Sequence, residues 1–202
     1  MKLDLMIEDC TAIIMAGGES SRMGQDKANL LLGKQTMLQT VCDTMRLIFP
    51  QVIISVHNLR PEMDSPQICD YPSHSGPLAG LFAGLVKADT PWIFAMACDM
   101  PFITPQIIEC LSRYRERVEA VVPMVHGYPQ PLSAFYAKSC LHVVREILDG
   151  DGRHSLRAVL DRLNVRYVNE NEMQEADPAL RSFFDLDTPQ DMEQAMNQES
   201  AK

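Results

Sequence analysis

The sequence predicts an α/β domain on a mostly parallel sheet, and three observations support this. Short apolar runs alternate with segments of helical periodicity, the 202-residue length fits one ordinary domain, and the chain has no repeat or long linker. Apolar residues make up 46% of the chain and charged residues 22%, which excludes a disordered protein. In sheets of this kind, ligands bind beyond the carboxyl ends of the strands.

The first half of the chain is predicted to alternate strands and helices. Residues 92–98 form a run that is apolar on both faces, as a buried parallel strand requires. Thr36 and Gln39 have the spacing of a capping box, and Thr104 followed by Pro105 is typical of a helix start. The predicted strands are residues 11–16, 51–56 and 92–98, and the predicted helices are residues 36–49, residues 78–87 and a segment after Thr104.

The second half is predicted to contain shorter elements. Ser155 can cap a helix whose apolar residues at positions 156, 159, 160 and 163 lie on one face. Thr188 and Pro189 are expected to begin a final helix. The predicted strands are residues 120–124, 132–136, 165–168 and 183–186.

Charge and cysteine content exclude several classes of protein. The formal net charge is -9, and nine acidic and two basic residues lie between Glu170 and Lys202, so the preceding chain is nearly neutral. Such a distribution is unsuited to binding nucleic acid or an anionic membrane. The six cysteines include no CxxC pair and are predicted to be reduced core residues of a cytoplasmic protein. Acidic residues near the N-terminus argue against an export signal, and no apolar run is long enough to cross a bilayer.

A glycine-rich loop follows the first predicted strand. Residues 16–27 read AGGESSRMGQDK, in which Gly17 and Gly18 let the backbone approach a ligand closely. Backbone N–H groups in such a loop can cradle phosphate oxygens, and Arg22 and Lys27 add positive charge. The spacing fits neither a Walker loop nor a GxGxxG fingerprint. We predict a phosphate site here, and the alternative is a glycine-rich turn with solvated charges.

Carboxylates follow two other predicted strands. Asp99 comes directly after a buried strand, where a charge needs a compensating partner, and Mg²⁺ prefers carboxylate oxygens. Because Thr104 is better placed to cap the next helix, Asp99 is predicted to bind a metal. Asp185 and Asp187 share one face of the last predicted strand, and either could be the second ligand. The alternative, weighted equally, is that Asp187 starts the following helix.

Two further positions could contact a nucleotide. Gly76, beside a turn proline, permits the close approach of a base or sugar, whereas helix packing alone could explain Gly80 and Gly84. Asn58, at the end of a predicted strand, could read a base edge through its amide or be a turn residue.

Five blocks of the sequence resemble the molybdenum cofactor guanylyltransferases. Residues 16–27 resemble the family signature AGGxSxRMGxDK, and four later blocks follow in the family's order, so the resemblance covers nearly the whole chain. PQPL at residues 129–132 favours the guanylyl branch over its cytidylyl relative. The later blocks are SGPLAGL at residues 75–81, CDMPF at residues 98–102, QPLSAFY at residues 130–136 and DTPQD at residues 187–191.

The resemblance implies a fold and an activity. Members of this family are similar in fold to one another: a three-layer α/β/α sandwich with a mostly parallel central sheet, the Rossmann-like nucleotidyltransferase fold. The resemblance implies one domain over residues 1–202, with a nucleotide-binding half at about 1–110, an acceptor-binding half at about 111–190 and an acidic helix or tail at 188–202. It implies transfer of GMP from GTP to the terminal phosphate of a molybdopterin-type cofactor, with Mg²⁺, and release of pyrophosphate.

The resemblance, together with the residue patterns, assigns the site. Arg22, Lys27 and Asp99 are expected to be catalytic, and Asp99 and Asp187 to bind the metal. The expected acceptor-binding residues are Gln130, Pro131, Arg153, Ser155 and Asp185. The expected nucleotide-binding residues are Met15, Ala16, Gly17, Gly18, Ser20, Arg22, Lys27, Asn58, Asp70 and Gly76.

The sequence departs from the family in its late block. The family usually has N-x-N-T-P, whereas this chain has carboxylates at Asp185 and Asp187 before Thr188. If Asp187 ligates the metal, its charge could strengthen the binding of Mg²⁺. If the family's amides donate hydrogen bonds to the pterin or to a phosphate, those bonds are lost here.

Other functions compatible with these residues remain open at the level of sequence. One is the same chemistry with another nucleotide or acceptor, as in a cytidylyltransferase or a sugar-phosphate nucleotidyltransferase, and another is a non-catalytic nucleotide-binding assembly factor. The expected partners are GTP and the molybdopterin-type cofactor, with proteins that deliver the cofactor. Nucleic acid and membranes are not expected partners, and a monomer or weak oligomer is expected.

Overall fold

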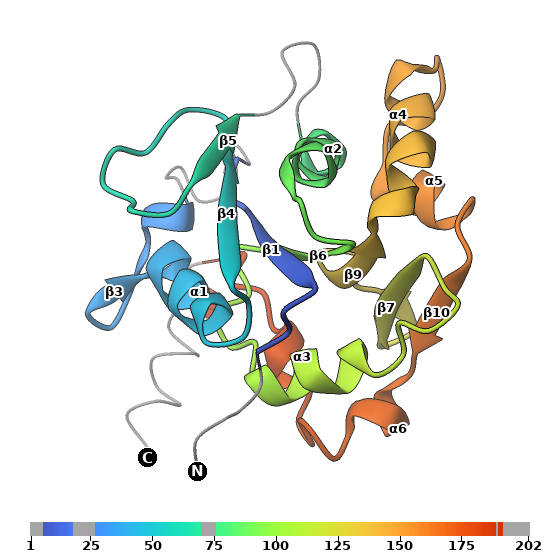
Figure 1. Cartoon of the computed structure of the whole chain (residues 1–202). Helices are drawn as coiled ribbons and strands as arrows, with labels where there is room; N and C mark the ends of the chain where they lie inside the picture. Colours follow the sequence, from blue (N-terminus) through green and yellow to red (C-terminus); the bar gives the residue numbers. More distant parts are fainter. Residues whose placement is uncertain (1–5, 18–26, 70–75, 189, 192–202) are drawn as a thin grey trace.

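A central sheet lies between two layers of helices (Figure 1). The structure is a computed structural model of the chain and describes residues 6–17, 27–69, 76–188 and 190–191. The helices are α1 (Met37–Arg46), α2 (Pro77–Lys87), α3 (Pro105–Ser112), α4 (Leu141–Asp149), α5 (Leu156–Leu160) and α6 (Glu170–Met173), with 3₁₀ turns η1 (Lys27–Asn29), η2 (Lys138–Cys140) and η3 (Arg181–Phe183). The strands are β1 (Cys10–Met15), β2 (Leu31–Leu32), β3 (Gln35–Thr36), β4 (Gln51–Val56), β5 (Gln67–Cys69), β6 (Trp92–Ala97), β7 (Ala120–Val125), β8 (Tyr128–Pro129), β9 (Ser133–Ala137) and β10 (Val165–Val168).

The sheet is mostly parallel, as the sequence predicts. Within the described residues its order is β10-β7-β9-β6-β1-β4-β5, with β8 paired to β7 and a separate hairpin of β2 and β3. Strand β9 runs antiparallel to β6 and β7, whereas the pairs β1–β4, β1–β6, β4–β5 and β7–β10 are parallel. The connection from β7 to β9 is too short for a crossover, so the chain must return in the opposite direction.

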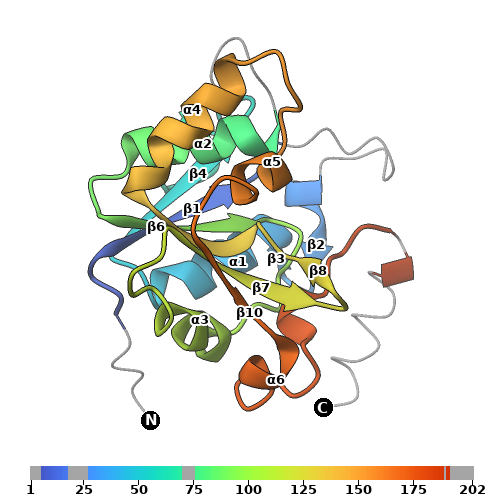
Figure 2. The same ribbon diagram turned by 90° about the vertical axis from the view of Figure 1, so that its right-hand side faces the viewer.

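Each face of the sheet carries its own apolar layer. Consecutive residues of β1 point to opposite faces, so that Ile13 packs on the side of α2 and Ile14 on the side of α1. Figure 2 shows α2, α4 and α5 on one side of the sheet and α1, α3 and α6 on the other. Both residues are fully buried, which explains why this strand is apolar on both faces.

Most predicted elements are confirmed. The capping box of Thr36 and Gln39 starts α1, and Thr104 and Ser155 cap α3 and α5 through their hydroxyl oxygens. The helix predicted for residues 36–49 ends earlier, at Arg46. Helix α4 was not predicted, although its apolar side chains at positions 143, 144, 147 and 148 have helical spacing. The short elements β2, β3, β5, β8 and α6 were also not predicted.

The strand predicted for residues 183–186 is wrong. The structure has the turn η3 there, followed by irregular chain. Leu186 is fully buried against Leu32 and Met37, so packing under the β2–β3 hairpin accounts for its apolar character. Asp185 and Asp187 therefore do not share a strand face, contrary to the prediction.

All six cysteines are free thiols, as predicted, but the prediction that all of them lie in the core is wrong, because Cys69 is exposed and Cys98 and Cys110 are only partly buried. Among the described residues, no helix combines the length and the apolar character that a membrane span requires.

Helix α2 approaches the sheet closely because it carries glycine where it crosses β1 and β4. A Cβ atom at Gly80 would lie 2.6 Å from Met15 Sδ and 2.9 Å from Ser55 Oγ. A Cβ atom at Gly84 would lie 2.9 Å from two side-chain carbons of Ile13. Helix–sheet packing thus accounts for both glycines.

We predict that Gly84→Ala destabilises the protein by about 1–2 kcal/mol, because Ile13 is β-branched and cannot move aside easily. Alanine favours a helix interior, so any loss reflects this contact alone. Urea unfolding measures the change, with Gly152→Ala as the control because a Cβ atom there meets nothing within 4 Å. Equal stabilities of the two variants would contradict the packing argument.

Candidate active site at the carboxyl ends of the strands

Three strand ends meet at one edge of the sheet. Met15 and Ala97 are partners in the parallel register of β1 and β6, and the Cys98 N–H donates to the Met15 carbonyl at 3.2 Å. The Ala16 N–H donates to the Ser55 carbonyl of β4 at 2.8 Å. The chain runs from β1 towards β4 on one side and from α2 back to β6 on the other. This is a topological switch point, where open α/β sheets bind their ligands.

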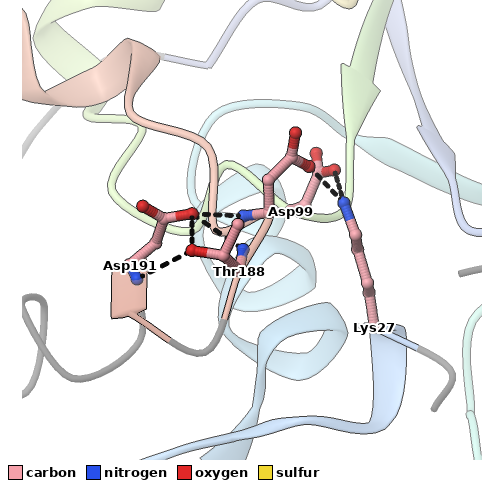
Figure 3. A network of polar contacts seen from close by, with 5 residues as sticks. Lys27, Asp99, Thr188 and Asp191 are labelled. Carbon is pink, nitrogen blue, oxygen red and sulfur yellow. Dashed lines mark hydrogen bonds and ion pairs between the residues drawn. The ribbon is translucent and has the colours of Figure 1, made fainter. Parts of the chain in front are cut away.

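Lys27 and two aspartates form the polar centre of this edge (Figure 3). The Lys27 Nζ lies 3.1 Å from Asp99 Oδ2 and also contacts Asp187 Oδ1. The side chains are partly buried, with exposed fractions of 18% for Lys27, 24% for Asp99 and 38% for Asp187. Lys27 lies in the turn η1, Asp99 follows the end of β6, and Asp187 lies in the segment between η3 and Asp191, which we call the late segment. Only the folded chain brings the three residues together.

The position of Asp99 agrees with the reasoning from sequence. Thr104 Oγ1 accepts the hydrogen bond of the Ile107 N–H, so Thr104 caps α3 and Asp99 is left for another role. The Leu186 N–H donates to the Asp99 carbonyl at 2.9 Å, which ties the late segment directly to the end of β6.

Asp191 organises the late segment. Its Oδ2 accepts hydrogen bonds from the Asp187 N–H at 3.1 Å, the Thr188 N–H at 2.7 Å and the Thr188 hydroxyl at 2.8 Å. The Asp191 N–H donates in return to Thr188 Oγ1 at 3.2 Å, which completes a reciprocal capping arrangement. The helix start is thus capped by Thr188, which exchanges hydrogen bonds with Asp191 (Figure 3). Asp187 is therefore not needed as the cap, and its carboxylate contacts Lys27. Sequence analysis missed Asp191, although the T-x-x-D spacing carried the signal.

The site has more negative than positive charge among its described residues. Burial lowers the pKa of the Lys27 ammonium, but hydrogen bonds and charges of Asp187 and Asp99 outweigh it, so this pKa lies above its ordinary value. Partial desolvation, with the nearby charges of Asp99 and Asp187, raises the pKa of the Asp185 carboxyl. Among the described residues, two carboxylates contact the one ammonium and a third lies close enough to interact with them, an arrangement that favours a further cation.

The two carboxylates Asp99 and Asp187 fit a magnesium ion. Mg²⁺ in nucleotide enzymes is held by one or two carboxylates and completed by phosphates and water, so a larger protein cage is not required. In the part of the chain that the structure describes, no group of three or more His, Cys, Asp or Glu side chains is arranged to hold a metal. The Lys27 ammonium between the two carboxylates shows that their oxygens converge on one cationic group.

The predicted nucleotide-binding residues lie at the same edge where they are described. Met15, Ala16 and Gly17 leave β1, and Asn58 is exposed just beyond β4. Gly76 precedes α2 with φ +91°, a conformation that favours glycine, and a Cβ atom there would meet no atom of the described residues within 4 Å. The predicted residues Gly18, Ser20, Arg22 and Asp70 lie outside the described residues.

The predicted acceptor-binding residues occupy two places. Gln130 and Pro131 lie just before β9, where the Leu132 carbonyl accepts from the Ala97 N–H at 3.0 Å, two residues before Asp99. Arg153 and Ser155 lie in the turn before α5. Arg153 is exposed, whereas the Ser155 hydroxyl oxygen accepts from the Ala158 N–H at 3.3 Å. Asp185 is exposed beside the carboxylate pair.

We predict that Asp191→Ala destabilises the protein by about 1–2 kcal/mol, because three donor bonds in a partly buried segment lose their acceptor. The matched control is Asp43→Ala, which removes an exposed carboxylate that bonds only flexible side chains among the described residues. Its expected effect is below about 0.5 kcal/mol. Urea unfolding compares the two variants, and an Asp191→Ala variant as stable as the control would show that the late segment is held by other contacts.

The chain is similar to known proteins over most of its length. Residues 12–167 match the family described as the MobA-like NTP transferase domain. The "Probable molybdenum cofactor guanylyltransferase" of Peptoclostridium acidaminophilum is 34% identical over 197 residues, covering 91% of this chain and 87% of that protein. The "Molybdenum cofactor guanylyltransferase" of Desulfosudis oleivorans is 32% identical over 189 residues, covering 92% and 93%.

The fold is also similar to that of solved structures. Molybdopterin-guanine dinucleotide biosynthesis protein A from Archaeoglobus fulgidus superposes with a TM-score of 0.83 at 27% identity, over 95% of this chain and all of that chain. A 2-C-methyl-D-erythritol 4-phosphate cytidylyltransferase from Thermus thermophilus superposes with a TM-score of 0.67 at 17% identity, over 94% and 98%, so it shares the fold alone. The matches agree with the glycine-rich end of β1 and with the contact of Lys27 with two carboxylates. This chain therefore belongs to the MobA-like NTP transferase family.

Proposed function

We propose that this protein transfers GMP from GTP to the terminal phosphate of a molybdopterin-type cofactor and releases pyrophosphate. The observation that carries the proposal is the convergence of Lys27, Asp99 and Asp187 beside the ends of β1 and β6. This position suits a triphosphate with a cation, and the related proteins named guanylyltransferases support the choice of guanine and of the pterin acceptor.

The reaction is one in-line displacement. A terminal phosphate oxygen of the acceptor forms a bond to the α-phosphorus of GTP, while the bond from that phosphorus to the bridging oxygen breaks and its electron pair leaves with pyrophosphate. The nucleophile is already an anion, so no protein group has to remove a proton or form a covalent intermediate. Catalysis then consists of holding the two substrates in line and balancing their charge.

Each charged residue has a defined role in this proposal. Lys27 moves its ammonium from the carboxylates to the β- and γ-phosphates, and it neutralises the departing pyrophosphate together with Arg22. Asp99 and Asp187 hold a divalent cation, which we infer to be Mg²⁺. When bound, this cation supplies charge neutralisation and polarisation of the phosphoryl oxygens. Asp185 lies beside this pair and adds negative charge that favours the cation.

The remaining residues bind the two substrates in this proposal. Gly76, where a Cβ atom would meet none of the described residues, lets the guanosine lie against the start of α2, and Asn58 and Asp70 read the nucleoside. Gln130 and Pro131 face the pterin from the start of β9, with Arg153 and Ser155 further out. The free thiols of all six cysteines support a cytoplasmic location. We further propose that a monomer or weak oligomer receives the acceptor from a protein partner.

We predict that the purified protein binds GTP in preference to CTP and ATP, and more tightly with Mg²⁺ than with a chelator. Isothermal titration with each nucleotide, with and without Mg²⁺, measures both differences. Preference for CTP would contradict the guanylyl assignment but retain the chemistry. The absence of binding to all three would contradict the proposed transferase activity.

We predict that Asp99→Ala reduces turnover about 100-fold or more without unfolding the protein, because the cation loses one of its two protein ligands. Turnover is measured as GMP transfer to the pterin acceptor, and the fold is checked by circular dichroism. Asp151→Ala, an exposed aspartate before α5, is the matched control and is expected to retain activity. Near-normal turnover of Asp99→Ala would remove this residue from the metal site.

A further inference from the structure

Arg60 links two segments that flank the glycine-rich loop in the sequence. It lies beyond the end of β4, and its guanidinium donates from Nη2 to the Ala16 carbonyl at 3.2 Å and from Nη1 to Asn29 Oδ1 at 2.9 Å. Ala16 follows the last residue of β1, and Asn29 ends the turn η1. One side chain thus joins the strand that leads into the phosphate-site sequence to the turn that follows it.

The main chain of Arg60 is itself fixed to the sheet. Its N–H donates to Gln67 Oε1 at 2.7 Å, and Gln67 Nε2 donates to its carbonyl at 2.7 Å. Gln67 begins β5 and is the register partner of Ile54 in β4. The main chain of Arg60 is therefore held in place, which limits the entropy lost when the guanidinium bonds Ala16 and Asn29.

The link ends close to the lysine of the site. Lys27 and Asn29 belong to the same 3₁₀ turn, which is closed by the Leu30 N–H donating to the Lys27 carbonyl at 3.1 Å. Fixing Asn29 therefore fixes the backbone from which the Lys27 side chain reaches Asp99. A planar guanidinium with several donors can bond two separated acceptors at once, whereas an ammonium acts as a point charge.

We propose that Arg60 is a positioning residue that holds Lys27 at the phosphate site by joining the end of β1 to the turn η1. This inference rests on the proposed function, because it takes the β- and γ-phosphates of GTP as the ligand of Lys27. It goes further by assigning a role to a residue that no sequence motif indicated. The proposal makes a specific prediction about affinity. Loss of the Arg60 guanidinium weakens the binding of a nucleoside triphosphate and leaves the binding of the monophosphate unchanged.

The test compares GTP and GMP binding to the whole protein by isothermal titration. Arg60→Met, which keeps the apolar stem, is expected to raise the dissociation constant for GTP about 10- to 100-fold and to leave that for GMP within about twofold. Arg60→Lys is expected to lie between Arg60→Met and the native protein. Arg113→Met is the matched control, because Arg113 is exposed and bonds Glu109 on α3 away from the site, and it is expected to change neither constant.

A second pair of variants tests whether Arg60 acts through Lys27. Lys27→Ala is expected to weaken GTP binding and spare GMP, and adding Arg60→Met to it is expected to cause no further loss. If Arg60→Met fails to fold, Asn29→Ala serves in its place, because it removes one acceptor of the same guanidinium. Its expected effect is a smaller loss with the same selectivity.

The outcomes separate this inference from the proposed function. Equal losses of GTP and GMP affinity in Arg60→Met, or no loss of either, overturn the positioning role, as does an additive loss in the double variant. A selective loss in Lys27→Ala without one in Arg60→Met overturns the role of Arg60 alone. Unchanged GTP affinity in Lys27→Ala overturns the triphosphate role of Lys27 and hence the proposed function at this point.

Discussion

The parallel register of β1 and β6 is the constraint on which the site depends. Their Cα atoms are partnered from Cys10 and Trp92 to Met15 and Ala97, so both strands end at the same height. A slip of one residue would turn the buried side chains of β1 to the wrong faces, and both faces are covered by helices. The close approach of α2 through Gly80 and Gly84 holds the strand against such a slip. The end of β1 and Asp99 are therefore neighbours because of packing elsewhere along these strands.

Electrostatics at this edge gives the lysine and the aspartates complementary roles. The Lys27 ammonium balances part of the charge of Asp99 and Asp187. It thereby stabilises the two carboxylates close to each other when no ligand is bound. A triphosphate introduces more negative charge than one lysine can balance. In the proposed complex, the carboxylates hold a divalent cation while Lys27 contacts the phosphates, so the proposed function gives the same residues different partners with and without substrate.

The sequence predicts those parts of the fold that have a local signal. The buried runs of β1, β4 and β6 and the cap of α3 at Thr104 each depend on neighbouring residues, and the structure confirms them. The direction of β9 depends on the length of its connection to β7, which the residues of the strand do not encode. The error at residues 183–186 has a similar origin, because Leu186 is apolar through packing against Met37, not through pairing in a sheet.

The candidate site shows the same difference between features with a local sequence signal and features set by long-range contacts. Lys27 and Asp99 lie in motifs, and their individual positions could be predicted from strand ends, whereas their mutual contact could not. Arg60 and Ala16 are 44 residues apart in the chain, and no periodicity connects them. Distances of this kind follow only from the order and register of the strands. The sequence therefore indicates the chemistry of the site more readily than the residues that hold it in place.

The contact between Lys27 and Asp187 spans 160 positions of the chain, and this has a consequence for how the protein is made. Synthesis proceeds from the N-terminus, so the glycine-rich segment, β1 and β6 leave the ribosome well before Asp187 does. A nascent chain that ends before residue 187 contains the strands of the central sheet but lacks one of the two carboxylates that face Lys27. The charged centre is therefore completed only after all the described strands of the central sheet have been synthesised.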